Sequence, residues 1–139
     1  MRFALVGITA LCALALAGPA LAAPKPSVAA LQVALQAKGH YVAPIDGVDG
    51  PQTQAALRTL HLRSGIRGET TVGPRTRAAL GLLGRPLLGQ RELFAGVTGW
   101  DVSSLEFQLR PFGLPVREVD GRFTSATATI RTPGSSWKR

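Results

Sequence analysis

The sequence contains a single cysteine, Cys12, which lies in an apolar stretch near the N-terminus. Everything after that stretch lacks cysteine, so a disulfide, a thiol nucleophile and a cysteine-ligated zinc are excluded there. Histidine is scarce as well, with only His40 and His61. A zinc peptidase or amidase site needs three protein ligands, and these two histidines are expected at a helix end and in mid-helix. We therefore predict no metal site and no cofactor.

Acidic residues are half as numerous as basic ones, eight against sixteen, and the net charge is +8. Glycoside hydrolysis needs two carboxylates facing each other across a cleft. The one close pair, Asp46 and Asp49, is more typical of a turn than of such a cleft. No serine lies in a Gly-x-Ser-x-Gly elbow, and no nucleotide-binding glycine pattern follows a strand. We expect a protein that is not an enzyme and has no catalytic residue.

The excess of basic residues favours polyanionic partners such as wall polymers, anionic head groups or peptidoglycan carboxylates. The basic residues are scattered along the chain rather than grouped in blocks. They do not alternate with aromatic residues, as base-stacking surfaces require. A basic module for anionic wall polymers or nucleic acid is therefore the weakest interpretation, and we expect no nucleic-acid partner.

The first 23 residues predict a secretory signal peptide. Met1-Arg2 is followed by an apolar run, and a small-x-small cleavage pattern ends at Ala23. A retained anchor is disfavoured because the run is shorter than the ~20 residues of a membrane span. Lipidation is disfavoured because Leu11, not a small residue, precedes Cys12. We expect a secreted or cell-wall-associated protein with no stable membrane span after cleavage.

The stretch from Asp46 to Thr53 predicts a tight turn that leads directly into a helix. Asp46-Gly47 is a turn dipeptide, because glycine accepts positive φ and aspartate bonds to nearby backbone N–H groups. Gly50 precedes Pro51, which suits the first position of a helix. Thr53 is expected to bond an unpaired backbone donor of that first turn.

Residues 28–84 are expected to form a small three-helix bundle, which makes the fold class all-α. The first helix is predicted to start at Ser27 as N-cap and to stop at Gly39. The second is expected over about 51–63. The third is expected over about 74–83, where Gly-Pro repeats the start signal of the second. Apolar residues recur at helical spacing within all three.

A second, incomplete copy of this unit is predicted over residues 101–131. Self-similarity at a fixed offset indicates a repeat. A linker over 85–100 joins the copies, and residues 132–139 are expected to form a disordered tail. The pairs that share the offset of 74 residues are Leu31/Leu105, Leu35/Leu109, Gly39/Gly113, Asp46/Asp120, Gly47/Gly121 and Thr53/Thr127.

The second copy departs from the first in ways that limit its core. Its helix is expected to begin at Asp101 as N-cap and to end near Arg110, because Pro111 follows. Phe123 is expected in the core, and order is expected to fall beyond about residue 124. The apolar face of Leu105 and Leu109 therefore needs a partner, or the first copy, to cover it.

The linker is expected to pack its apolar residues on a neighbouring surface, and Trp100 is expected to be a packing anchor rather than a ligand platform. The apolar linker residues are Leu87, Leu88, Leu93, Phe94 and Val97.

The motifs together resemble the bacterial peptidoglycan-binding-like domain, a three-helix module, over 28–84 and incompletely over 101–131. Some positions depart from that family. Asp49 stands where an aromatic residue is usual, Leu60-His61 replaces Phe-Gln, and an Asp-Gly expected near Glu69 is absent. In the second copy Glu106 replaces glutamine and Thr124 replaces glycine. The residues that carry the resemblance are Leu31-Gln32, Leu35, Gly39, Tyr41, Asp46-Gly47, Gly50, Thr53, Ala56-Leu57, Gly65-Ile66, Gly73-Pro74, Thr76 and Ala79-Leu80-Gly81.

The resemblance implies a non-catalytic module that targets or anchors proteins on peptidoglycan. A groove floored by a turn and helix N-termini, with an aromatic wall, suits muramyl peptides. The expected ligand-binding residues are Tyr41, Pro44, Asp46, Gln52, Thr53 and Arg75. A purely structural turn role is the competing interpretation for Asp46, Gly47, Gly50, Asp120, Gly121 and Thr127.

Two alternatives to peptidoglycan binding stay open at this point. The first alternative is that the chain is a regulatory partner of a cell-wall hydrolase. It is suggested by the half-copy, which leaves an apolar face to be covered. The second alternative is that the chain is a truncated remnant of such a hydrolase, because the helical pattern stops abruptly after Ile130.

Overall fold

The computed structural model describes residues 22–113 and 118–128, and the regular structure in these ranges is helical. The all-α prediction is therefore confirmed for the described residues, where the only strand-like pairing is one antiparallel bridge between Thr98 and Arg122. The predicted signal peptide, up to residue 21, and the predicted tail over 132–139 lie outside the described residues. The helices are α1 (Pro26–Ala37), α2 (Pro51–Arg63), α3 (Pro74–Leu80), α4 (Trp100–Leu109) and α5 (Ser125–Ala128), with short 3-10 turns η1 (Gly81–Gly84) and η2 (Arg110–Phe112).

The first three helices all begin with proline, at Pro26, Pro51 and Pro74. Proline is suited to the first helical position because its N–H would have no partner there and its φ is already helical. The bounds predicted for the second helix are confirmed. Ser27 lies inside α1, and the residue before the helix is Lys25, so the predicted serine cap is wrong. The proline one residue earlier starts the helix instead.

Asp101 is likewise not the N-cap of α4. The helix begins at Trp100 after Gly99, and Asp101 lies in its first turn with 1% of its surface exposed. Its carboxylate faces the linker, where Arg91 donates to it from Nε at 2.8 Å and from Nη2 at 3.1 Å. The aspartate therefore fixes the linker to α4, and its Oδ1 also accepts from the backbone N–H of Val102 in the first turn at 2.9 Å.

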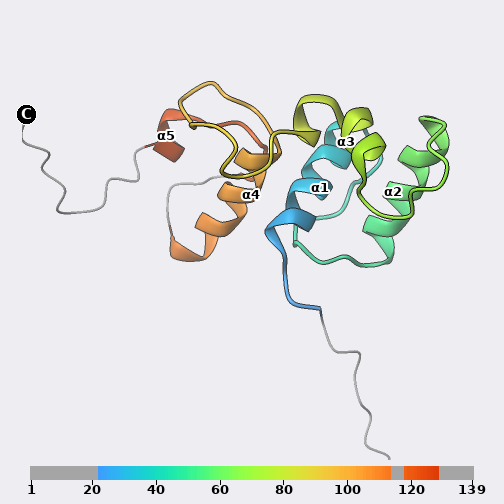
Figure 1. Ribbon diagram of the computed structural model, residues 1–139. Coiled ribbons are helices and arrows are strands. Elements are labelled where there is room, and N and C mark those ends of the chain that lie inside the picture. The colour runs from blue at the N-terminus through green and yellow to red at the C-terminus, as the bar shows by residue number, and fades with distance from the viewer. Residues whose placement is uncertain (1–21, 114–117, 129–139) are drawn as a thin grey trace, which may run out of the picture.

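Helix α1 is the centre of the molecule, with α2 on one side and α4 on the other (Figure 1). Seven consecutive residues, Ala29 to Leu35, are buried. A helix that is apolar all round must be covered on every face, and here α2, η1 and α4 share that role. The main core cluster comprises Ala30, Leu31, Ala34, Leu35, Tyr41, Ala56, Leu57, Leu60, Leu80 and Trp100.

The predicted second copy packs on the first through α4. Phe123 is buried, as predicted, and Trp100 belongs to the main core cluster, so its expected role as a packing anchor is confirmed. Leu105 and Leu109 are only half-buried. Their counterparts on α1, Leu31 and Leu35, are buried. Docking on α1 therefore covers only part of the α4 apolar face.

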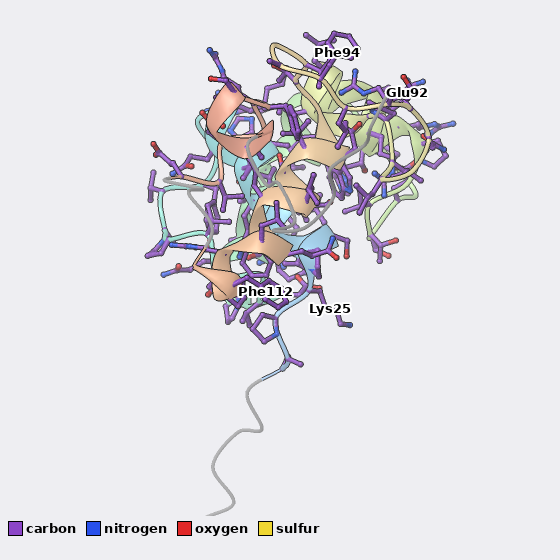
Figure 2. The ribbon with its side chains drawn as sticks, turned by 90° about the vertical axis from the view of Figure 1, so that its left-hand side faces the viewer. Lys25, Glu92, Phe94 and Phe112 are labelled. Carbon is purple, nitrogen blue, oxygen red and sulfur yellow. The ribbon has the colours of Figure 1, made fainter. Side chains whose placement is uncertain are left out.

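The linker does not pack its apolar side chains as fully as predicted. Leu87, Leu88 and Phe94 are exposed, and only Leu93 and Val97 are half-buried. The prediction was wrong for the first three. Figure 2 shows Phe94 at the opposite end of the molecule from Phe112, the other exposed phenylalanine. These two exposed rings therefore do not share one continuous apolar patch.

Candidate functional site

The Asp46-Gly47 turn is held by the side chain of one α1 residue, Gln32, which is 0% exposed. Its Oε1 accepts from the backbone N–H groups of Asp46 at 3.1 Å and Gly47 at 2.9 Å. Its Nε2 donates to the Asp46 carboxylate at 2.7 Å, to the Val48 carbonyl at 3.1 Å and to the Thr53 hydroxyl at 3.1 Å. The amide uses both of its ends, so the turn is fixed to α1 and cannot shift without breaking several buried bonds.

Thr53 contributes to this network and not to a helix cap. Its hydroxyl donates to the Val48 carbonyl at 3.1 Å and accepts from Gln32. The expected bond to an unpaired backbone donor of α2 is wrong, since the hydroxyl donates back to a carbonyl in the turn. Gly50 precedes the helix without a side-chain cap. The structural interpretation of Asp46, Gly47 and Thr53 is therefore supported by their contacts.

The same arrangement recurs in the predicted second copy, with glutamate in place of glutamine. Glu106 Oε2 accepts from the backbone N–H groups of Asp120 at 3.2 Å and Gly121 at 2.9 Å. Burial, with a further contribution from the nearby Asp120 charge, raises the pKa of Glu106 to about 7, although the backbone N–H of Gly121 opposes the change. Asp120 and Gly121 are therefore bound to α4 as Asp46 and Gly47 are bound to α1.

A third turn, before α3, uses a carboxylate where the family pattern has Asp-Gly. Glu69 accepts from the backbone N–H groups of Arg75 and Thr76, both at 3.0 Å, and from the Thr76 hydroxyl at 2.7 Å. The Thr76 hydroxyl bond is the largest cause of the lowered pKa of Glu69. His61 Nε2 lies 2.7 Å from the same hydroxyl and is buried, which makes it a core residue.

The sequence-predicted ligand residues divide into buried and exposed groups. Tyr41 and Thr53 are buried, and the Tyr41 hydroxyl donates to the Pro44 carbonyl at 2.9 Å. Burial also raises the pKa of Tyr41. These two side chains offer little surface to a ligand. The exposed ones are Pro44, Asp46, Gln52 and Arg75, which stay predicted ligand contacts.

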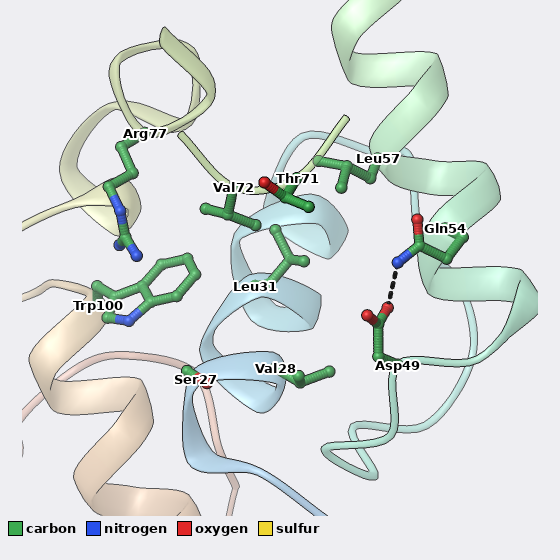
Figure 3. Close-up of a pocket in the computed structure, with 10 residues that line it drawn as sticks. All are labelled: Ser27, Val28, Leu31, Asp49, Gln54, Leu57, Thr71, Val72, Arg77 and Trp100. Atoms are coloured by element: carbon green, nitrogen blue, oxygen red, sulfur yellow. Dashed lines mark hydrogen bonds between the residues drawn. The ribbon is translucent and has the colours of Figure 1, made fainter. Parts of the chain in front are cut away.

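The side chains that face a concave surface are different ones. A pocket of about 160 Å³ lies between α1, α2 and the segment that leads into α3 (Figure 3). Its floor is aliphatic, and its rim carries hydroxyl, amide and charged groups. The lining residues are Ser27, Val28, Leu31, Asp49, Gln54, Leu57, Thr71, Val72, Arg77 and Trp100.

The two ends of this pocket carry opposite charges. At one end, Gln54 Nε2 donates to the Asp49 carboxylate at 2.6 Å. At the other end, the Arg77 guanidinium lies 4.4 Å from the centre of the Trp100 ring. Figure 3 shows these two groups on opposite sides of Leu31. Burial lowers the pKa of Arg77 because it removes water from the charged form.

Sequence reasoning identified neither Arg77 nor Gln54 as a site residue. Both lie on helices whose starts the Gly-Pro signals mark, and each comes about one turn after its signal. Their meeting in one pocket depends on how α2 and α3 pack on α1, which the local pattern does not encode. Trp100 was expected to serve packing alone, and it also forms part of the pocket wall.

Two features are absent from the described residues. No group of three or more histidine, cysteine or acidic side chains is placed to hold a metal ion there. None of the helices in the described ranges has the length and apolar character needed to cross a bilayer.

Comparison with known families gives one match. A family described as "Putative peptidoglycan binding domain" matches residues 24–80. The matched segment contains α1, α2 and α3 and all of the pocket lining except Trp100. Residues 24–80 therefore match the model of this family, which confirms the predicted resemblance for that segment. Comparisons with curated proteins and with solved structures give no match.

Proposed function

We propose that the chain is an exported, non-catalytic module that binds peptidoglycan and serves as a targeting or anchoring unit. The observation that carries the proposal is that the matched segment, 24–80, forms a pocket with an aliphatic floor and a polar rim. Such pockets, with a few well-placed polar groups, are the usual form of small-ligand sites. Peptidoglycan lies outside the plasma membrane, which agrees with the signal peptide predicted over residues 1–23.

The pocket is held in shape before any ligand arrives. Asp49 and Gln54 flank the turn that Gln32 binds to α1, and their side chains are hydrogen-bonded to each other on its exposed side. A side chain that is already ordered loses less conformational entropy when it binds a ligand. Binding by this face therefore depends on the same turn that resembles the family pattern.

Sedimentation of the full chain with insoluble murein tests the proposal. Gln54→Ala removes a rim amide of the pocket, and we expect it to lower the sedimented fraction severalfold. Gln36→Ala is the matched control, because Gln36 is exposed and lies outside the pocket lining, and we expect it to bind as the unmodified chain does. Gln52→Ala tests the turn side instead. Loss of binding in Gln52→Ala with binding kept in Gln54→Ala would place the site there, with the predicted contacts Pro44, Asp46 and Arg75.

Two controls separate specific binding from other behaviour. The chain has a net charge of +8, and attraction by charge alone falls steeply as salt screens it. Retention at about 0.5 M salt, where screening acts within about 3–5 Å, is therefore the expected result. Zymography on murein gels tests the non-catalytic expectation, and a cleared zone would contradict it.

A protein-binding role, as a regulatory partner of a cell-wall hydrolase, is the second candidate. It is favoured by the half-buried Leu105 and Leu109, whose counterparts on α1 are buried. If this surface binds protein, Leu105→Asp should abolish the complex with a wall hydrolase while murein sedimentation is kept. Absence of any such complex in crosslinking with the hydrolases of the same cell would remove this candidate.

A further inference from the structure

The pocket is small for a ligand site. Its volume is about 160 Å³, whereas sites that enclose a drug-sized ligand measure about 300–1,000 Å³. A group the size of an amino-acid side chain with its attached amide fits such a volume. The aliphatic floor, formed in part by Val28, Leu31 and Leu57, favours a small apolar side chain such as a methyl group.

The aromatic residue of the pocket is not placed to stack on a sugar. Binding sites for sugar rings commonly offer the open face of an aromatic side chain. Trp100 is only 3% exposed, and Arg77 covers a face of its ring at 4.4 Å. The ring acts as a support for the guanidinium, because cation–π contact holds the planar group over it.

The Arg77 guanidinium has no acidic partner among the described residues. Among the described residues, its side chain donates a single long hydrogen bond, from Nη1 to the Gly84 carbonyl at 3.4 Å. A half-buried guanidinium that lacks a counter-charge favours a carboxylate ligand, which it can bind through two parallel N–H bonds. Arg85 adds charge at this end, because it lines an adjoining hollow of about 260 Å³ together with Arg77 and Val72.

The other end of the pocket offers a hydrogen-bond acceptor, whereas the Arg77 end offers donors. Asp49 and Gln54 form a bonded pair at 2.6 Å, and the carboxylate keeps acceptor capacity for an N–H group. Together the pocket presents a cation, an apolar floor and an acceptor in sequence (Figure 3). A short peptide with a free carboxylate has the complementary groups in that order, whereas a glycan strand presents mostly neutral hydroxyls and acetamides.

We propose that this pocket binds the peptide stem of peptidoglycan rather than its glycan strand, with Arg77 on a stem carboxylate and Asp49 and Gln54 on a stem N–H group. This inference rests on the proposed function, since it names the part of peptidoglycan that the same pocket takes. It also gives the predicted second copy a role. Trp100 is the first residue of α4, so docking of α4 on α1 completes the pocket from outside the matched segment.

The experiment compares three materials with the full chain: intact insoluble murein, glycan strands freed of peptide by an amidase and then amidated at the lactyl carboxylates that the cleavage exposes, and the synthetic tripeptide L-Ala-γ-D-Glu-diaminopimelic acid. We expect sedimentation with intact murein, at least a tenfold weaker association with stripped glycan, and competition by the free tripeptide. Equal binding to intact and stripped strands, or no competition by the tripeptide, would overturn the inference and leave peptidoglycan binding in place. No binding to any of the three would overturn the proposed function itself.

Variants locate the carboxylate contact. Arg77→Gln removes the charge, and we expect tripeptide affinity to fall at least tenfold. Arg67→Gln is the matched control, because Arg67 is exposed and lies outside the pocket, and we expect no change. If Arg77→Gln fails to fold, Asp49→Asn replaces it, since Asp49 is exposed, and its affinity should fall severalfold. Unchanged affinity in a folded Arg77→Gln or in Asp49→Asn would contradict the inference.

Discussion

Glu106 stands on α4 where Gln32 stands on α1, and each accepts hydrogen bonds from the two backbone N–H groups of an Asp-Gly turn. The two side chains differ at their second terminal atom, which is the Nε2 nitrogen in Gln32 and a carboxylate oxygen in Glu106. The amide of Gln32 donates to the Asp46 carboxylate at 2.7 Å. A carboxylate cannot donate, so Glu106 can reproduce that bond toward Asp120 only when it is protonated.

This substitution predicts a pH-dependent stability. The pKa of Glu106 is raised to about 7 from 4.5, first by burial and then by the charge of Asp120. The native state therefore binds this proton more tightly than the unfolded state does. The stabilisation is complete below about pH 4.5, the unfolded value, and is lost as the pH rises through about 7.

Glu106→Gln should remove the effect. The amide supplies the missing donor at every pH and carries no charge, so we expect unfolding in urea to show a gain of about 1–2 kcal/mol at pH 8. Little change is expected at pH 4. Glu92→Gln, an exposed position in the linker, is the control and should change neither value. Equal effects of Glu106→Gln at both pH values would contradict the assignment.

Gln32 should be among the most costly α1 residues to truncate. Gln32→Ala leaves the backbone N–H groups of Asp46 and Gly47 without their partner, and each unsatisfied buried donor costs about 1–3 kcal/mol. We expect a loss of about 3 kcal/mol in the free energy of unfolding, measured in urea, against almost none for the exposed Gln36→Ala. Gln32→Glu should in turn give the first turn the pH dependence of the second. A loss below 1 kcal/mol for Gln32→Ala would show that water satisfies the turn.

Much of the fold could be predicted because its signals are local. The Gly-Pro starts and the spacing of apolar residues predicted α2 with its bounds, Pro51–Arg63. Local signals also misled at two helix starts. Ser27 is a good N-cap by type, but Pro26 begins the helix one residue earlier. Asp101 is a good N-cap by type, but its carboxylate pairs with Arg91.

The site was less predictable because its contacts join distant parts of the chain. Gln32 reaches partners 14 to 21 residues away, and its place in the family pattern does not reveal that it binds the turn. The meeting of Arg77 with Trp100 depends on α4 docking on α1. Aromatic and turn residues, such as Tyr41 and Thr53, were expected to face a ligand because of their type, but folding buries them.

A pair of glycines tests the docking of the second copy on the first. Gly47 and Gly39 have nearly equal positive φ, 70° and 72°, so alanine suffers a similar backbone strain of about 1–2 kcal/mol at each. A Cβ at Gly39 meets nothing within 4 Å, but at Gly47 it would lie 2.6 Å from the Phe107 ring of α4. We therefore expect Gly47→Ala to lower the melting temperature more than Gly39→Ala.

The added cost at Gly47 should be about 1–3 kcal/mol, the usual penalty of overpacking. Phe107→Ala removes the ring, so most of the difference between the two glycine variants should disappear in a Phe107→Ala background, and the rest comes from the Lys25 backbone nitrogen 3.1 Å from the added Cβ. If Gly47→Ala and Gly39→Ala are equal in the unmodified chain, α4 does not pack against the turn in solution.

The last prediction concerns the ion pair that binds the linker to α4. Arg91 donates to Asp101 through two nitrogens and also to the Thr98 carbonyl at 2.8 Å. The Asp101 hydrogen bond raises the pKa of Arg91. Because Asp101 is buried, Arg91→Ala strands a carboxylate without a counter-charge, and we expect unfolding in urea to show a loss of about 2–3 kcal/mol. Arg67→Ala, an exposed arginine, should cost almost nothing.

Two further variants show whether the Arg91–Asp101 pair depends on the shape of the guanidinium or on its charge alone. Arg91→Lys keeps the charge but cannot bond both carboxylate oxygens and the Thr98 carbonyl with a planar group, so it should recover only part of the loss. Asp101→Asn in the Arg91→Ala background removes the stranded charge, and the double variant should therefore be more stable than Arg91→Ala alone. A double variant whose stability equals the sum of the two single losses would show that the two side chains are not coupled.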